Sequence, residues 1–311
     1  MSLLAAPPAI LAAALILDAL FGEPEPVWRR LPHPAVLMGR AVGALDGALN
    51  RGRARRAKGA AALAILLAAA WAVGAAVAAL PLQPAPQILL VAILLAQRSL
   101  ADHVRAVAVG LDRGLEKGRA EVAKIVGRDV AALDEAGVAR GAIESGAENF
   151  SDGIVAPAFW FLALGAPGIV AYKMANTADS MIGYRTERHE AFGWAAARFD
   201  DIVNLIPARL SAGLLALGGL SARALPVAWR DAGLHRSPNA GWPEAATAAA
   251  IGVALSGPRA YHGRMTDDPF VFPEGRRDPG AGAIRDAVRL LWRGWAVGLA
   301  LAALWAAALA F

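Results

Sequence analysis

The chain of 311 residues contains no cysteine and few charged residues. Without cysteine it can form no disulfide and no thiolate metal site, so any bound metal must be held by oxygen or imidazole ligands. Only 18% of the residues are charged, whereas 57% are hydrophobic, a balance outside the range of ordinary globular domains. We therefore predict an integral membrane protein.

Common sequence motifs for catalysis are also missing. The chain has no GxxxxGK[ST] phosphate loop, no GxSxG elbow and no HExxH zinc motif. The net charge is +5, but the basic residues are not interleaved with aromatic residues, so we expect no binding to nucleic acid. If the protein uses a nucleotide, it must hold it by another arrangement.

Long apolar runs predict an all-α fold: a polytopic helical membrane protein with about four to six membrane-embedded segments, in one domain over residues 1–311. The segments are expected at about 3–21, 59–80, 84–100, 154–172, 203–222 and 292–311. Glycine and proline interrupt the fourth run, for instance at Gly165 and Pro167, and the run around Leu210 is too short to cross alone. We therefore expect broken or re-entrant helices there.

The distribution of basic residues predicts the topology. Eight Lys and Arg residues lie between Gly22 and Lys58, and none lies between Pro81 and Gln87. The positive-inside rule then places the first loop in the cytoplasm and the second outside. The polar region 98–152 returns to the cytoplasm, where its helical spacing and mixed charges favour helices at or below the membrane surface.

Three acidic residues stand four positions apart at Glu144, Glu148 and Asp152. On a helix this spacing puts them on one stripe. No Lys or Arg lies between Arg140 and Lys173 to neutralise them. Hard oxygen ligands of this kind suit magnesium or calcium. The alternative is a solvated helix face, or acids that complement a helix dipole.

A second cluster comprises Lys173, Asn176, Asp179 and Ser180. The spacing places the first three on one helical face. A lysine beside a carboxylate and an amide can hold a phosphate together with its metal. The alternative is a buried salt bridge with an amide cap.

A third cluster comprises Arg198, Asp200, Asp201 and Asn204. Asp201 is three residues from both Arg198 and Asn204. Because adjacent aspartates point to different faces of a helix, we expect only one of them to share a site with these two residues. The alternative is a helix N-terminus or an interfacial ion pair.

Three further residues are candidates for substrate contacts. His33 and His235 lie in proline-bearing segments that fix their positions, and Arg185 can bind an anionic group. A lone loop histidine more often makes a structural hydrogen bond, and ordinary solvation is the alternative for the arginine.

Four motifs, in order through nearly the whole chain, carry a family resemblance. They are LDALFGEPEPVWRRLPHPAVLMGR, ESGAENFSDGIVAPAFW, YKMANTADSMIGYRTERHEAFGWAAARFDDIVNLIPARL and HRSPNAGWPEAATAAAIGVALSGPRAYHG. With them the chain resembles the adenosylcobinamide-phosphate synthase family of cobalamin biosynthesis. The resemblance implies a multi-pass protein of the cell inner membrane. It also implies a ligase that uses ATP to join adenosylcobyric acid to aminopropanol phosphate or aminopropanol.

This reaction suggests roles for the candidate residues. Magnesium would be held by Glu144, Glu148, Asp152 and Asp179, the nucleotide by Lys173, Asn176 and Ser180, and the substrates by Arg185, His235 and His33; Glu144, Glu148, Asp200 and Asp201 are the candidate catalytic residues. The active site is expected to face the cytoplasm, where ATP is present. An oligomer, or a complex with other enzymes of the pathway, is left open.

Two other classes of function compete with this interpretation. Broken helices with acidic residues are also used by ion-coupled transporters, although the chain shows no inverted repeat. A non-enzymatic membrane sensor or scaffold is the third class, but clustered acids would have little purpose there.

Overall fold

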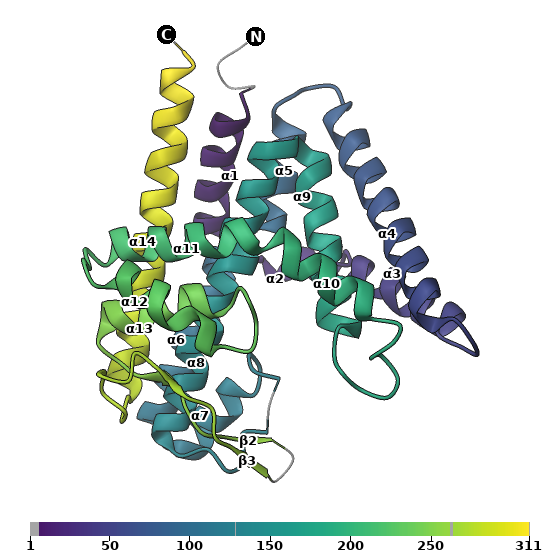
Figure 1. Cartoon of the computed structure of the whole chain (residues 1–311). Helices are drawn as coiled ribbons and strands as arrows, with labels where there is room; N and C mark the ends of the chain where they lie inside the picture. Colours follow the sequence, from purple (N-terminus) through teal and green to yellow (C-terminus); the bar gives the residue numbers. More distant parts are fainter. Residues whose placement is uncertain (1–5, 128, 262–263, 311) are drawn as a thin grey trace. The chain divides into compact units, whose positions relative to one another are not determined.

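The computed structural model describes residues 6–127, 129–261 and 264–310 and is mostly helical (Figure 1). Its helices are α1 (Pro7–Phe21), α2 (Glu25–Trp28), α3 (Pro34–Leu49), α4 (Arg55–Ala78), α5 (Ala85–Leu94), α6 (Gln97–Asp112), α7 (Leu115–Val122), α8 (Glu135–Phe150), α9 (Ala156–Ile182), α10 (Trp194–Val203), α11 (Leu205–Gly218), α12 (Ala224–Asp231), α13 (Gly241–Ile251) and α14 (Ala281–Ala308). A π-helical turn, Ser151–Val155, joins α8 to α9, and a 3-10 turn, Ala232–Leu234, follows α12. Short antiparallel strand pairs join β1 (Leu255–Ser256) to β4 (Phe270–Val271) and β2 (Arg259–Tyr261) to β3 (Arg264–Thr266). The predicted all-α class is confirmed.

Several helical segments are long and apolar enough to cross a membrane. Among the described residues these are Arg55–Ala78, Ala85–Asp112, Glu135–Ile182 and Ala281–Ala308, and the pair Trp194–Val203 with Leu205–Gly218 passes as one span bent by 45°. The predicted polytopic fold is thus confirmed, with a broken helix near Leu210 as expected. Helix α1, with 15 residues, is shorter than the about 20 that a span needs. Residues 3–5 and 311 of the predicted terminal segments lie outside the described residues.

The expected interruption of the fourth apolar run is a break inside α9. Gly165 has φ 70° and ψ −157°, a conformation that glycine adopts without strain, and Pro167 follows it. A Cβ atom on Gly74 of α4 would lie 2.5 Å from the carbonyl oxygen of Ala166. Helix α4 therefore approaches the backbone of α9 closely at the break. A larger residue in place of Gly74 would prevent this close approach.

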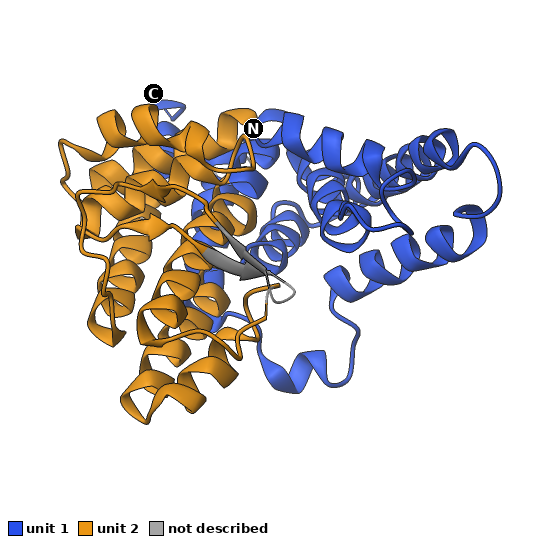
Figure 2. Cartoon of the chain, turned by 60° about the horizontal axis from the view of Figure 1, so that its bottom comes forward, with its two compact units in different colours: residues 1–96, 156–204, 302–311 blue, residues 97–155, 205–301 orange. Residues whose placement is uncertain are grey.

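The described chain forms two compact units (Figure 2). Unit 1 contains residues 1–96, 156–204 and 302–311, and unit 2 contains residues 97–155 and 205–301. Compactness by itself does not show that each unit folds independently. The predicted single domain over residues 1–311 therefore stays a prediction.

Unit 2 contains helices that bury many small residues. Helix α8 packs against α6, α7 and α13, and α13 also packs against α11 and α12. Most of α13 is buried, including its run of alanines. Because alanine and glycine allow close approach between helices, α13 packs closely against its neighbours.

Candidate active site

In unit 1, helices α9 and α10 bring residues of the second and third clusters together. Asp200 of α10 is 9% exposed, and Asn204, just after this helix, is 1% exposed. The amide nitrogen of Asn204 donates to Oδ2 of Asp200 at 2.9 Å, and its Oδ1 accepts a hydrogen bond from the Tyr172 hydroxyl at 2.9 Å. A buried, oriented carboxylate therefore stands at the centre of the site.

Two further carboxylates lie near Asp200. The charge of Asp179, on α9, interacts with those of Asp200 and Asp201. The amide nitrogen of Asn176 approaches Oδ1 of Asp200 at 3.5 Å, a long hydrogen bond. Because like charges repel strongly where solvent screening is weak, this arrangement favours a cation, a proton or a substrate ammonium among the carboxylates.

The adjacent aspartates have different partners. Asp201 pairs with Arg198 at 3.1 Å, whereas Asn204 hydrogen-bonds to Asp200. The aspartate that Asn204 orients is therefore Asp200, and a site shared by Asn204 and Asp201 stays a prediction. Asn204 contacts the residue four positions earlier, which is its neighbour on the same helical face.

Lys173 belongs to a second polar group in unit 1. Nδ1 of His33, at the N-cap of α3, accepts a hydrogen bond from the backbone N–H of Ala35 at 3.2 Å. Burial lowers the pKa of His33; the negative charge of Glu23 opposes this shift, and the positive charge of Lys173 adds to it. The ring is therefore neutral at pH 7. His33 and Lys173, both predicted to bind ligands, are within electrostatic range of each other.

Two other predicted residues of unit 1 are at the surface. Ser180 lies near the end of α9, and Arg185 lies in the loop that follows, and both are exposed. Their roles in binding the nucleotide and the substrate stay predictions.

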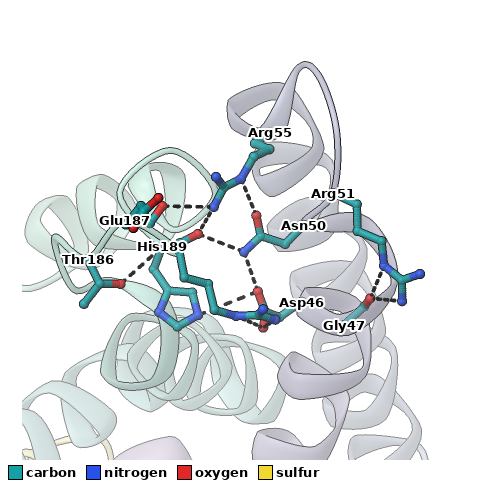
Figure 3. A network of polar contacts seen from close by, with 9 residues as sticks. Asp46, Gly47, Asn50, Arg51, Arg55, Thr186, Glu187 and His189 are labelled. Carbon is teal, nitrogen blue, oxygen red and sulfur yellow. Dashed lines mark hydrogen bonds and ion pairs between the residues drawn. The ribbon is translucent and has the colours of Figure 1, made fainter.

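The loop of residues 183–193, which joins α9 to α10, is tied to α3 and α4 by a network that sequence analysis missed (Figure 3). Asp46, buried on α3, accepts hydrogen bonds from the guanidinium of Arg188 and, at 2.7 Å, from Nδ2 of Asn50. Asn50 also donates to the carbonyl oxygen of Arg188 at 3.0 Å. Arg55 donates to the same carbonyl and, at 2.6 Å, to Oδ1 of Asn50. The network thus holds both the side chain and the backbone of Arg188.

Glycines at the two ends of this loop permit close contacts with α9. A Cβ atom on Gly183 would lie 1.9 Å from Oδ1 of Asp179, and one on Gly193 would lie 1.6 Å from the carbonyl oxygen of Ile182. Neither distance is compatible with a side chain. The glycines and the Asp46 network together fix the loop beside Asp179.

The stability that Asp46 provides is expected to depend on pH. Burial would raise the pKa of Asp46, but the hydrogen bonds from Arg188 and Asn50, together with the charge of Arg188, outweigh it and hold the pKa below its ordinary value of 3.8. The carboxylate of Asp46 binds a proton more readily in the unfolded chain than in the folded protein. Its contribution to the free energy of unfolding is therefore complete above pH 3.8 and is lost as the pH falls through the lower folded-state pKa. Thermal unfolding in detergent should therefore show the wild type more stable than Asp46→Asn at pH 7, with a gap that narrows in acid. A gap that does not change with pH would contradict this account.

The acidic stripe of the first cluster lies in unit 2 and is not uniform. Glu144 is 5% exposed, and its Oε1 accepts a hydrogen bond from the backbone N–H of Ser256 at 2.7 Å. Glu148 is exposed, and Asp152 lies in the π-helical turn after α8 ends. The expectation of one regular helical stripe is therefore wrong. Glu144 holds the backbone of β1 at Ser256, which has a positive φ.

His235, also in unit 2, has partners at both ring nitrogens. Nδ1 accepts a hydrogen bond from the backbone N–H of Ser237 at 3.0 Å, and Nε2 lies 3.5 Å from Oε1 of Glu244. Because Nδ1 accepts, Nε2 carries the proton and points toward the carboxylate. This supports the structural alternative for His235, and its role in substrate binding stays a prediction.

The fit of magnesium depends on how much of its coordination the protein supplies. Among residues 6–127, 129–261 and 264–310, no group of three or more His, Asp or Glu side chains is placed to hold a metal ion. Magnesium bound with a nucleotide needs only one or two carboxylates, because water and phosphate complete the shell. Asp179, within electrostatic range of Asp200, satisfies this smaller requirement. The predicted set of Glu144, Glu148, Asp152 and Asp179 stays a prediction.

The fold and these residues define a polytopic helical membrane protein with a buried acidic cluster and a separate polar group that contains His33 and Lys173. A family model described as "CobD/Cbib protein" matches residues 11–291. The chain belongs to the CobD/Cbib family, as its four motifs predicted. No solved structure matches it.

Curated relatives are similar over most of their length. The cobalamin biosynthesis protein CobD of Rhizobium meliloti (strain 1021) is 52% identical over 284 residues, which cover 86% of this chain and 87% of the relative. The protein of the same name from Sinorhizobium fredii is 49% identical over 300 residues, 91% of this chain and 92% of its own. The protein of the same name from Rhodobacter capsulatus is 49% identical over 275 residues, which cover 85% of this chain and 86% of the relative.

Proposed function

We propose that this protein joins adenosylcobyric acid to (R)-1-aminopropan-2-yl phosphate, or to aminopropanol, in an ATP-dependent amide ligation. With the phosphorylated amine the product is adenosylcobinamide phosphate, an intermediate of cobalamin biosynthesis. The CobD/Cbib family and the names of the relatives support this pathway. The observation that carries the proposal is the buried Asp200, oriented by Asn204 among further carboxylates.

Amide formation from a carboxylate requires activation, because a carboxylate is a poor acyl donor. ATP would supply it by transferring a phosphoryl group to a propionate oxygen of the corrinoid. The amine nitrogen then attacks the carbonyl carbon, and phosphate leaves with the electrons of the C–O bond. The nitrogen must also lose a proton, for which the site needs a base.

Asp200 is the best placed residue for this base. Its carboxylate is buried, and Asn204 and Tyr172 hold it in one orientation. A carboxylate in this position attracts the ammonium form of the amine and accepts one of its protons, which frees the nitrogen lone pair to attack. The second proton leaves with the phosphate as the amide forms. Asp201, paired with Arg198 nearer the surface, is the less suitable of the two candidates.

The other residues of unit 1 serve the phosphates and the metal. Lys173 would contact a phosphate, with Asn176 and Ser180 completing the nucleotide site. Magnesium, held by Asp179, would neutralise charge on the transferred phosphate. His33 and Arg185 would bind substrate groups. We also propose that the protein lies in the cell inner membrane, with this site on the cytoplasmic side, where ATP is available.

The proposal is tested by the dependence of ATP consumption on the substrates. Protein purified in detergent should consume ATP, and form the amide, only when adenosylcobyric acid and the amine are both present. The product is identified by mass spectrometry. An ion-coupled transporter or a sensor would show no such double dependence, and its absence would refute the ligase.

Replacing Glu148 with Gln tests the part assigned to the first cluster. If Glu148 is a metal ligand, this change should lower turnover by more than about tenfold, since even indirect perturbation of a metal site has effects of that size. Glu116→Gln is the matched control, because it removes another exposed acid of unit 2, one that pairs with Arg119. Turnover near that of the wild type in Glu148→Gln would exclude Glu148 from the chemistry.

A further inference from the structure

A groove of about 360 Å³ lies between α6 and α7 in unit 2. Its walls carry the basic residues Arg105, Arg113 and Lys117 and the acidic residues Asp102 and Glu121. None of these residues has a part in the proposed reaction. The groove is thus a separate feature of the protein.

Close packing of the two helices shapes the groove. A Cβ atom on Gly110 of α6 would lie 2.8 Å from the carbonyl oxygen of Lys117, and one on Gly118 would lie 2.3 Å from Cδ2 of Leu111. The glycines let α7 fold back closely on α6. As a result Arg113, in the turn, and Lys117, on α7, line the same groove as Arg105.

The acids of these two helices are already neutralised by other residues. Asp102 is paired with Arg98 at 2.7 Å and with Arg105 at 3.4 Å, and Glu121 is paired with Lys124 at 2.7 Å. Asp112 pairs with Arg285, and Glu116 pairs with Arg119.

Within the described chain, Arg113 and Lys117 have no such partner. Two cations therefore remain unpaired in one groove, where an anion would relieve their mutual repulsion.

The remaining lining of the groove is apolar. Ala106, Gly110 and Val109, the last of which is 40% exposed, lie between the charged residues. Helix α6 also forms the end of the candidate membrane span Ala85–Asp112. The end of a span meets the headgroup layer of the bilayer. A phospholipid in the headgroup layer presents both a phosphate and an apolar portion.

We propose that this groove binds the headgroup of an anionic phospholipid, with its phosphate at Arg113 and Lys117 and its glycerol against Ala106 and Val109. Basic residues next to a membrane span attract anionic lipids in general, and a groove adds a defined place for one headgroup. The proposal does not depend on the ligase reaction. Lipid binding at the groove can therefore be measured whether or not the ligase reaction is observed.

The test compares two double variants of the full-length protein in a neutral detergent. Arg113→Gln/Lys117→Gln removes the unpaired cations of the groove, and Arg30→Gln/Arg40→Gln removes two exposed arginines that do not adjoin a candidate span, so the net charge is equal. Phosphatidylglycerol should raise the thermal unfolding midpoint of the wild type more than phosphatidylcholine does. Its affinity should fall about 30-fold in the groove variant, from the usual contribution of two basic residues, and much less in the control.

Three results would overturn the proposal. The first is an equal response of the wild type and the groove variant to phosphatidylglycerol. The second is an equal loss in both double variants, which would show a general effect of charge. The third is stabilisation by inorganic phosphate or ATP, lost in the groove variant, without a matching effect of phosphatidylglycerol, which would make the site one for a soluble phosphate.

Discussion

Asp200→Asn is expected to lower the turnover of ATP-dependent amide formation by about 100- to 10,000-fold, the range for loss of a general base. The substitution keeps the size of the side chain, and its oxygen can still accept a hydrogen bond from Asn204. What it removes is the negative charge that attracts the ammonium and accepts its proton. Because a buried charge among other carboxylates is costly for folding, the variant should be at least as stable as the wild type.

Asp201→Asn is the matched control for this prediction. It removes a carboxylate from the neighbouring position. That carboxylate pairs with Arg198, and the side chain of Arg198 is 51% exposed. Exposed ion pairs contribute little to stability, so the fold of the site should not change. Because the proposed base, Asp200, is still present, a much smaller loss of turnover is expected. Steady-state rates of product formation, with unfolding midpoints measured in parallel, distinguish the two variants. If Asp201→Asn were the inactive one, the base would be Asp201.

Orientation of the base can be examined separately. Tyr172→Phe removes the hydroxyl that donates to Asn204 and leaves the ring in place. It should reduce turnover less than Asp200→Asn does, because the carboxylate itself remains.

Much of the fold could be predicted from the sequence because it depends on local composition. Long apolar runs indicate membrane helices wherever they pack, and Gly165 and Pro167 break a helix by their own backbone properties. Helical periodicity also grouped Asn176 with Asp179, and both interact with Asp200. The grouping of Lys173 with them stays a prediction. These inferences need no knowledge of distant residues.

The parts that failed depend on contacts between distant residues. Asp46 and Arg188 are 142 positions apart, and Glu144 and Ser256 are 112 apart. An acidic side chain that accepts a hydrogen bond from a distant backbone looks, in sequence, the same as a solvated acid or a metal ligand. The spacing of Asp46 and Asn50, four residues apart at the C-terminal end of α3, was a usable local signal for part of the network.

The glycines around the loop of residues 183–193 are a further example of long-range constraint. Gly59 of α4 approaches this loop so closely that a Cβ atom would lie 1.9 Å from the carbonyl oxygen of Phe192. A glycine in an apolar helix is ordinary in sequence, and only the structure shows which ones are required. The Asp46 network and these glycines act on the same loop. The losses of stability caused by substitutions in the network and at the glycines should therefore not be additive.

Gly193→Ala is expected to have the largest effect on folding. The new methyl group would lie 1.6 Å from the carbonyl oxygen of Ile182. Neither atom can rotate away, because the position of Cβ is fixed by the backbone and the oxygen belongs to the backbone. The loop and the start of α10 would have to move, which strains the hydrogen bonds that hold Arg188. We expect a loss at or above the upper end of the about 1–3 kcal/mol typical of overpacking. The unfolding midpoint and amide formation should fall together, since α10 carries Asp200.

Gly213→Ala, in the interior of α11, is the control for this substitution. A Cβ atom there has no neighbour within 4 Å, so the alanine should raise stability by about 0.5–1 kcal/mol through the lower entropy of the unfolded chain. The two variants make the same chemical change, one at the N-cap of α10 and the other inside α11. Opposite shifts of the unfolding midpoint would show that the close contact of Gly193, rather than loss of a glycine, determines the result. A midpoint for Gly193→Ala equal to that of the wild type would mean that the loop can leave α9 without cost, and the loop could then not be what positions Asp179 beside Asp200.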